Sequence, residues 1–185
     1  MVNNEQKNKI MQDLIYGLLR NRQKRFEGFR TKVYWDSTGN LTVGWGHNIT
    51  ICGFPEKMMT KYKDMIRVIS RPLTNKMCEE LLTCDLENAV IDLSKFFGWS
   101  EFSEFGLNRQ EAMKDMVFNM GIIKFSKFKK MVEAIRVEDW LEAGRQIKNS
   151  KYYDDCTKVV NGLRKKGYKN TFHRAGENMQ LIIEG

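Results

Sequence analysis

The sequence is poor in the residues that build metal sites and rigid turns. It contains only 2 prolines, 2 histidines and 4 cysteines. The cysteines form no C-x-x-C pair, and two histidines add little to them, so we predict no zinc site and no other metal or cofactor. Cys78 and Cys84 lie six positions apart on one predicted helix, on poorly matched faces, which disfavours a local disulfide. We therefore expect reduced thiols, as in proteins made in the cytoplasm.

Long apolar runs are absent too. No run approaches the roughly 20 residues that a membrane-spanning helix needs. Residues 1–10 are polar and lack the apolar core of a signal peptide. We expect a protein that is made in the cytoplasm and does not insert stably into a membrane. If it acts on a target outside the cytoplasm, another factor has to release it.

The remaining composition is that of an ordinary globular protein with a basic surface. Hydrophobic residues make up 42% and charged residues 29% of the 185 positions, enough for one core or two small lobes. The formal net charge of +8 indicates an anionic partner, either nucleic acid or bacterial cell wall, or simply a soluble basic surface. Composition alone does not separate these three.

The stretch from residue 26 to residue 47 carries the clearest chemistry. Glu27 closes a predicted helix, Asp36 opens the turn of a predicted hairpin, and Thr42 lies on the returning strand. Aspartate often opens turns and threonine favours strands, so each of the two alone has a structural explanation. Two carboxylates and a hydroxyl held on a tight backbone are, however, what the hydrolysis of a glycosidic bond requires.

Ten residues of this stretch stand at the spacing E-G-x-R-x-x-x-Y-x-D-x-x-G-x-x-T-x-G-x-G-H. They are Glu27, Gly28, Arg30, Tyr34, Asp36, Gly39, Thr42, Gly44, Gly46 and His47. The pattern resembles the signature of the bacteriophage-type lysozymes, the endolysins or muramidases of T-even-like phages. The resemblance implies an α+β, mostly helical fold with two lobes and a cleft between them. A small lobe with a β-hairpin or three-stranded sheet is joined by a long helix to a helical C-terminal lobe.

Periodicity and turn residues place the remaining elements on one domain of residues 1–185. The predicted strands span residues 32–35, 41–45 and 67–70. The predicted helices span residues 4–26, 55–64, 75–97, 101–106, 109–121, 126–135 and 138–149, and a last helix ends near residue 183. Thr74 and Asn108 are the expected caps of two helices. The expected lobes are residues 26–73 and 98–185, joined by the helix of 74–97, with the helix of residues 1–25 packed on the helical lobe.

The resemblance also implies roles for residues outside the three catalytic candidates. His47 is expected to pair with Asp85 on the long helix, a contact that stabilises rather than catalyses. The expected substrate contacts are Asn48, Phe118, Asn119, Phe128, Gln146 and Arg174. Among these, Arg174 falls where an arginine of the family approaches the catalytic glutamate, although a plain surface arginine is the alternative.

The segment of residues 155–171 is longer than the connection usual in the family. We read it as a loop rich in lysine and arginine, which either contacts anionic wall polymer or is an ordinary surface loop. Its basic residues are Lys158, Arg164, Lys165, Lys166 and Lys169.

The implied reaction is cleavage of the β-1,4 bond between N-acetylmuramic acid and N-acetylglucosamine in peptidoglycan, by a protein expected to be a monomer. Glu27 protonates the leaving oxygen, Asp36 stabilises positive charge and helps to activate water, and Thr42 positions that water. Inversion at the anomeric carbon is the expectation from the family, and retention through a covalent intermediate on Asp36 remains open.

A lytic transglycosylase needs only the glutamate. A non-catalytic module that binds cell wall, or nucleic acid, would show affinity without cleavage, and the three catalytic residue types favour an enzyme that does not bind nucleic acid.

Overall fold

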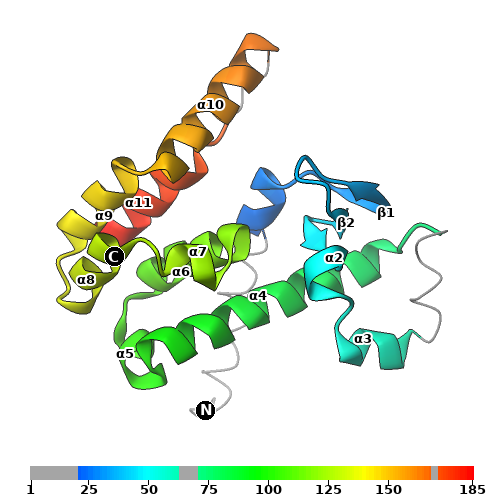
Figure 1. Ribbon diagram of the computed structural model, residues 1–185, viewed down its shortest axis with the longest axis horizontal. Coiled ribbons are helices and arrows are strands. Elements are labelled where there is room, and N and C mark those ends of the chain that lie inside the picture. Colours follow the sequence, from blue (N-terminus) through cyan, green and yellow to red (C-terminus); the bar gives the residue numbers. More distant parts are fainter. Residues whose placement is uncertain (1–20, 63–70, 168–170) are drawn as a thin grey trace, which may run out of the picture. The chain divides into compact units, whose positions relative to one another are not determined.

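The computed structural model describes residues 21–62, 71–167 and 171–185. The chain divides into two compact units, Met1–Asn88 and Ala89–Gly185. The boundary falls inside the long helix α4, Asn75–Phe97, which therefore contributes residues to both units (Figure 1). None of the helices within the described ranges combines the length and the apolar character that crossing a bilayer requires.

The first unit is built around a small antiparallel sheet. Strands β1 (Arg30–Trp35), β2 (Leu41–Gly44) and β3 (His47–Asn48) pair in the order β1-β2-β3. The hairpin of β1 and β2 was predicted, whereas the strand predicted at residues 67–70 lies outside the described residues. Residues 21–26 are helical, as expected for the end of the first predicted helix. The earlier residues of that helix also lie outside the described part.

Two short helices follow the sheet and close its core. Helix α2 (Ile49–Cys52) is capped by Asn48, whose side-chain oxygen accepts the Ile51 N–H at 3.0 Å. Helix α3 (Glu56–Lys61) starts after Pro55, where a fixed φ suits a helix start, and it ends three residues before the predicted limit. The buried core of this unit consists of Val43, Met58, Leu73, Cys78, Leu81 and Cys84.

Helix α4 has the bounds that its sequence predicts, because both of its ends carry local signals. The Thr74 hydroxyl accepts the Met77 N–H at 3.2 Å, and Gly98 ends the helix with a φ of +91°. At about 1.5 Å per residue its 23 residues extend over about 34 Å. Ala89, Leu93 and Phe97 near its C-terminal end belong to the core of the second unit.

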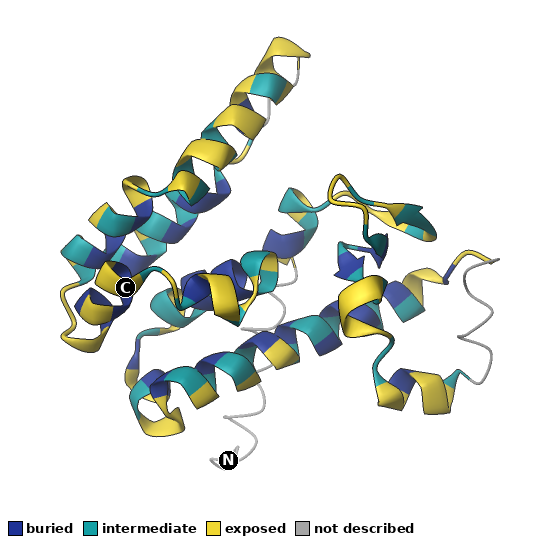
Figure 2. Cartoon of the chain, viewed as in Figure 1, coloured by how far each residue is buried: buried dark blue, intermediate teal, exposed yellow. Residues whose placement is uncertain are grey.

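The second unit is helical. Its helices after α4 are α5 (Trp99–Glu104), α6 (Leu107–Met120), α7 (Ile122–Phe125), α8 (Lys129–Arg136), α9 (Trp140–Lys148), α10 (Lys151–Lys165) and α11 (Arg174–Glu184). Helix α11 packs against α6 and α9, and α8 packs against α9. Residues 112–117 of α6 are all buried, so α6 is the centre of this unit's core (Figure 2).

Two predicted helix starts are wrong. Asn108 does not cap α6, because the helix begins at Leu107 after Gly106, whose carbonyl accepts the Gln110 N–H at 3.0 Å. The helix predicted over 126–135 begins three residues later, as α8 at Lys129, and the short helix α7 before it was not predicted. Between them the backbone folds back on itself, with the Phe128 N–H donating to the carbonyl of the fully buried Phe125.

The prediction of a basic loop at 155–171 is wrong as well, since most of that segment forms α10. The Ser150 hydroxyl caps this helix by accepting the Tyr153 N–H at 3.2 Å. Tyr152 and Cys156 pack against the core of this unit, and Val160, four residues further on, is buried too, so a spacing of four residues explains why the segment is helical. The basic residues up to position 166 lie on this helix or at its end, and Lys169 lies outside the described residues.

Candidate active site

Glu27 lies at the end of the first described helix and against the turn between β2 and β3. Its N–H still donates to the Gln23 carbonyl at 2.9 Å, which makes it the last residue of that helical turn. A Cβ atom added to Gly46 would come within 3.2 Å of Glu27 Oε2, and Gly46 has a φ of +86°. Both observations require glycine at position 46. The backbone of this turn is therefore one wall of the space around the Glu27 carboxylate.

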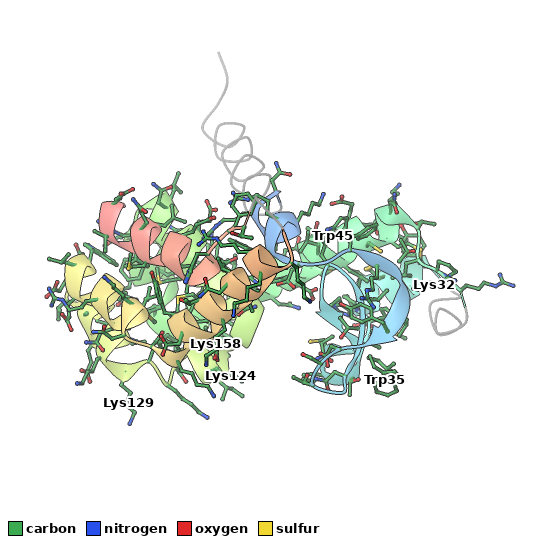
Figure 3. The ribbon with its side chains drawn as sticks, turned by 90° about the horizontal axis from the view of Figure 1, so that it is seen from above. Lys32, Trp35, Trp45, Lys124, Lys129 and Lys158 are labelled. Carbon is green, nitrogen blue, oxygen red and sulfur yellow. The ribbon has the colours of Figure 1, made fainter. Side chains whose placement is uncertain are left out.

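Aromatic and cationic groups surround this turn. The rings of Phe29 and Trp45 stack with centroids 4.2 Å apart, and Lys24 Nζ lies 4.7 Å from the Trp45 ring. Lys24 also forms an ion pair with Glu79 of α4. Trp45 thus lies beside the helix that ends at Glu27 (Figure 3), and these contacts connect the turn with both that helix and α4.

Asp36 opens the hairpin turn, and one of its carboxylate oxygens accepts three hydrogen bonds. Its Oδ1 accepts the Thr38 N–H and the Thr38 hydroxyl, each at 2.8 Å, and the Asn40 N–H at 2.9 Å. The Asn40 N–H, followed by the Thr38 hydroxyl, lowers the pKa of Asp36 to about 2, because these donors stabilise the ionised carboxylate. Asp36 is consequently an anion at any pH above about 3.

The other oxygen of Asp36 faces Thr42. The distance from Thr42 Oγ1 to Asp36 Oδ2 is 3.5 Å, and the distance from Thr42 Oγ1 to the Asn40 carbonyl oxygen is 3.3 Å. Both distances are long for a hydrogen bond of a hydroxyl group, so the Thr42 hydroxyl is only weakly bound to either acceptor. Thr42 is buried, and it is the middle member of a row across the sheet, between Tyr34 on β1 and Asn48 on β3. Opposed residues share a face of the sheet, so Asn48 lies beside Thr42.

Tyr34 experiences the charges of both carboxylates. Burial, and to a smaller extent the negative charges of Glu27 and Asp36, raise the pKa of Tyr34, while Arg30 acts in the opposite direction. The Arg30 guanidinium carbon lies 4.5 Å from the Tyr34 ring centroid. Tyr34 and Arg30 are two of the ten matched positions to which the sequence gave no role. Because both residues stand at fixed spacing from Glu27 and Asp36 in the motif, their position near the two carboxylates could have been predicted.

His47 forms a buried pair with Asp85 of α4, as the resemblance implies. His47 Nδ1 lies 2.9 Å and 3.0 Å from the two Asp85 carboxylate oxygens, and His47 Nε2 lies 2.7 Å from the Gly53 carbonyl oxygen. A carbonyl only accepts hydrogen bonds, so beside an ionised Asp85 both ring nitrogens must carry protons. Burial by itself lowers the pKa of His47, but the hydrogen bond and charge of Asp85 and the Gly53 carbonyl outweigh it, so the pKa is raised.

In the second unit, Phe118 and Asn119 follow the buried stretch of α6. Phe118 is half-buried and Asn119 is exposed. The Arg174 guanidinium carbon lies 6.0 Å from the Phe118 ring centroid. Arg174 and Glu27 belong to different units, so the approach between them remains a prediction.

Arg174 is instead part of a buried polar cluster that the sequence did not reveal. Its Nε lies 3.0 Å from Oδ2 of the fully buried Asp115, and its second terminal nitrogen lies 3.1 Å from Asp115 Oδ1. The Asn178 amide donates to Asp115 at 2.7 Å and contacts the Tyr152 hydroxyl at 3.1 Å. The available signals were an aspartate within an otherwise apolar stripe, and an arginine and an asparagine four residues apart on α11.

Phe128 and Gln146 are brought together in a pocket of about 360 Å³. Its walls are formed by the segment at the start of α8, by the end of α9 and by Ser150, the N-cap residue of α10. The pocket is lined by Lys127, Phe128, Lys129, Lys130, Met131, Gln146, Asn149 and Ser150. The described part of the chain holds no group of three or more side chains suited to bind a metal ion.

Comparisons with known proteins give a consistent result. A family model described as phage lysozyme matches residues 24–170. The chain is 28% identical over 158 residues to probable T4-type lysozyme 2 of Dictyostelium discoideum, which covers 77% of the chain and 89% of that protein. It is 30% identical over 133 residues to probable T4-type lysozyme 1 of the same organism, covering 67% and 78%. It is also 30% identical over 142 residues to the pre-baseplate central spike protein Gp5 of Enterobacteria phage T4, covering 70% of the chain but 24% of that protein.

Proposed function

Because the chain belongs to the phage lysozyme family, we propose that it hydrolyses the β-1,4 bond between N-acetylmuramic acid and N-acetylglucosamine in bacterial peptidoglycan. The arrangement of the first unit carries the proposal. One carboxylate, Glu27, lies against the Gly46 turn, and a second carboxylate with a pKa of about 2, Asp36, faces the Thr42 hydroxyl. Tyr34 is affected by the charge of both. Two carboxyl groups with different surroundings are the usual requirement for hydrolysing a glycosidic bond.

In this reaction Glu27 is the general acid that protonates the oxygen of the leaving sugar. Asp36 remains ionised and stabilises the positive charge that develops on the other sugar ring. Thr42 orients the attacking water, because its hydroxyl makes only long contacts and can exchange them for a water molecule bound between Thr42 and Asp36 Oδ2.

The surroundings of Asp36 favour inversion over retention. Retention requires Asp36 to attack the anomeric carbon and form a covalent bond. A carboxylate with a pKa of about 2 and three donors on Oδ1 is a weak nucleophile. Its remaining oxygen faces a hydroxyl at 3.5 Å, an arrangement that suits the binding of water. We therefore propose an inverting hydrolase.

The substrate contacts proposed beside this centre are Asn48 on the sheet and five residues of the second unit. Those five residues are Phe118, Asn119, Phe128, Gln146 and Arg174. We propose that the protein works as a monomer on the periplasmic cell wall, that it binds peptidoglycan rather than nucleic acid, and that a separate factor releases it from the cytoplasm.

The test compares wild type with Glu27→Gln in the clearing of Gram-negative cells whose outer membrane has been permeabilised. Mass spectrometry of the released fragments identifies their ends. Glu104→Gln, an exposed residue of α5, is the matched control. We expect fragments with reducing muramic acid ends from wild type and the control, and none from Glu27→Gln.

Two other outcomes would replace the proposal. Anhydro-sugar ends would identify a lytic transglycosylase, which needs no positioned water. Binding of cell wall without any released fragment would identify a non-catalytic wall-binding module, and its affinity should then fall steeply with salt.

A further inference from the structure

The lining of the pocket at the start of α8 is rich in positive charge. Three of its eight lining residues are lysines, namely Lys127, Lys129 and Lys130, and none of its lining residues is acidic. Within the described ranges none of these three ammonium groups lies within ion-pair distance of a carboxylate. Other lysines of the chain are paired in this way, for example Lys57 with Glu87 and Lys61 with Glu80.

Two carboxylates lie near the pocket, Glu133 of α8, one turn after Lys129 and Lys130, and Glu142 of α9, and among the described residues neither forms an ion pair with the three lysines. Glu142 of α9 lies one turn before Gln146, but its oxygens already accept from Gln146 Nε2 at 2.6 Å and from Arg145. The pocket also includes the start of α8, whose first residues follow Phe128 without a side-chain cap. The partial positive charge of a helix N-terminus therefore adds to that of the lysines. Figure 3 shows the Lys129 side chain pointing outward from this part of the unit.

The other lining groups determine what kind of anion fits. Phe128 and Met131 supply apolar wall, and Gln146 and Asn149 supply amide groups. A volume of about 360 Å³ is at the lower end of the range for small-ligand sites, and it holds a group the size of a short peptide. The pocket thus suits a compact ligand that combines apolar, amide and carboxylate parts, rather than a bare ion or a neutral sugar.

We propose that this pocket, here called the lysine pocket, binds a free carboxylate of the peptide attached to muramic acid. As a result the protein prefers cell wall with ionised stem peptides over cell wall with amidated ones. The inference rests on the function proposed above. A carboxylate and a carboxamide have nearly the same shape, so the discrimination comes from charge, which three lysines distinguish and a neutral pocket does not.

The test measures kcat and KM on two soluble glycans that differ only in whether the stem carries a carboxylate or a carboxamide. An exposed ion pair changes an equilibrium by about 1.4- to 5-fold, so three lysines together predict a preference of about tenfold for the carboxylate form. The preference should appear in KM, with kcat unchanged, and should shrink in 0.5 M salt because exposed charges are screened.

Two triple variants with the same change of charge locate the effect. Changing Lys127, Lys129 and Lys130 to Gln should raise KM for the carboxylate form about tenfold and abolish the preference. Changing Lys32, Lys76 and Lys95 to Gln, all exposed and outside the pocket, should retain it. Equal KM values for the two glycans in wild type, or a preference that survives in the pocket variant, would overturn the proposal.

A binding measurement separates the two proposals. Wild type is titrated, with NMR detection, against N-acetylmuramyl-L-alanyl-D-glutamate and against the D-isoglutamine compound, which replaces one carboxylate by an amide. Neither probe contains the bond to be cleaved. If neither glycan is hydrolysed, the proposed function fails. A tighter binding of the glutamate probe that depends on the three lysines then still supports the lysine pocket, and equal binding of the two probes overturns it.

Discussion

Replacing Asp85 by asparagine tests the buried pair that joins the sheet of the first unit to α4. Asparagine has the shape of aspartate but no charge. The His47 side chain is 2% exposed and the Asp85 side chain 16%, so the pair is largely shielded from water. Removing one partner of a buried ion pair costs about 3–5 kcal/mol. The partial exposure of Asp85 and the hydrogen bond that asparagine still forms reduce the expected loss to about 2–3 kcal/mol.

The loss should depend on pH with a defined sign. The pKa of His47 is raised in the folded protein above its ordinary value of 6.5. The proton therefore stabilises the fold fully below pH 6.5, and this stabilisation is lost as the pH rises through the pKa of the folded state. Between the two values the folded state binds up to one proton more than the unfolded state. The free energy of unfolding should thus fall by up to about 1.4 kcal/mol per pH unit.

The assay is thermal unfolding of wild type and Asp85→Asn at pH 6 and pH 9, followed by circular dichroism. At pH 6 the variant should melt about 4–12 °C below wild type, since 1 kcal/mol corresponds to about 2–4 °C in a protein of this size. At pH 9 the difference should be smaller, because wild type has by then lost part of its stabilisation.

Glu87→Gln is the matched control. Glu87 lies on the same helix two residues after Asp85, and its pair with Lys57 is exposed, with 42% and 60% of the two side chains accessible. An exposed pair contributes about 0.2–1 kcal/mol, so this variant should melt within a few degrees of wild type. Equal melting temperatures of Asp85→Asn and wild type at both pH values would refute the reasoning.

Two further predictions concern the groups around the two carboxylates that we propose as catalytic, Glu27 and Asp36. Gly46→Ala places a methyl group 3.2 Å from Glu27 Oε2 and strains a backbone with a φ of +86°. It should lower kcat by about tenfold or more, because displacing a catalytic group by a fraction of an ångström is costly; steady-state kinetics on permeabilised cells check this, and an unchanged kcat would contradict it. Thr38→Val removes the hydroxyl that donates to Asp36, so the pKa of Asp36 should rise from about 2 toward its ordinary value. Carbon-detected NMR titration of the Asp36 carboxyl measures this, and an unchanged value would show that the backbone donors suffice.

Much of the hairpin and of α4 could be predicted because the signals are local. The turn at Asp36 is stabilised by donors from residues 38 and 40, all within five positions of the chain. The bounds of α4 depend on a threonine at one end and a glycine at the other. The order of Glu27, Asp36 and Thr42 along 16 positions also follows from the sequence, and with it the chemistry that we propose.

Helix α10 shows where local reasoning failed. Its basic residues and the unusual length of the segment suggested a loop. The helix forms because Tyr152 and Cys156 pack against the second core beside α9 and α11, a surface that exists only once those two helices are in place. Charge on the outer face of a helix carries little information about the backbone, whereas the spacing of buried residues carries more.

Contacts between distant residues account for the other features that the sequence did not reveal. Asp115 and Arg174 are 59 positions apart, and a buried ion pair is recognised only when both burial and partner are known. The lysine pocket likewise joins residues 127–131 to residues 146–150, and its charge is recognised only when the fold shows that, within the described part of the chain, its three lysines form no ion pair with a carboxylate. Short-range hydrogen bonds and caps are encoded in neighbouring residues. Burial and electrostatic balance depend on every element packed around a side chain, so they exist only in the folded protein.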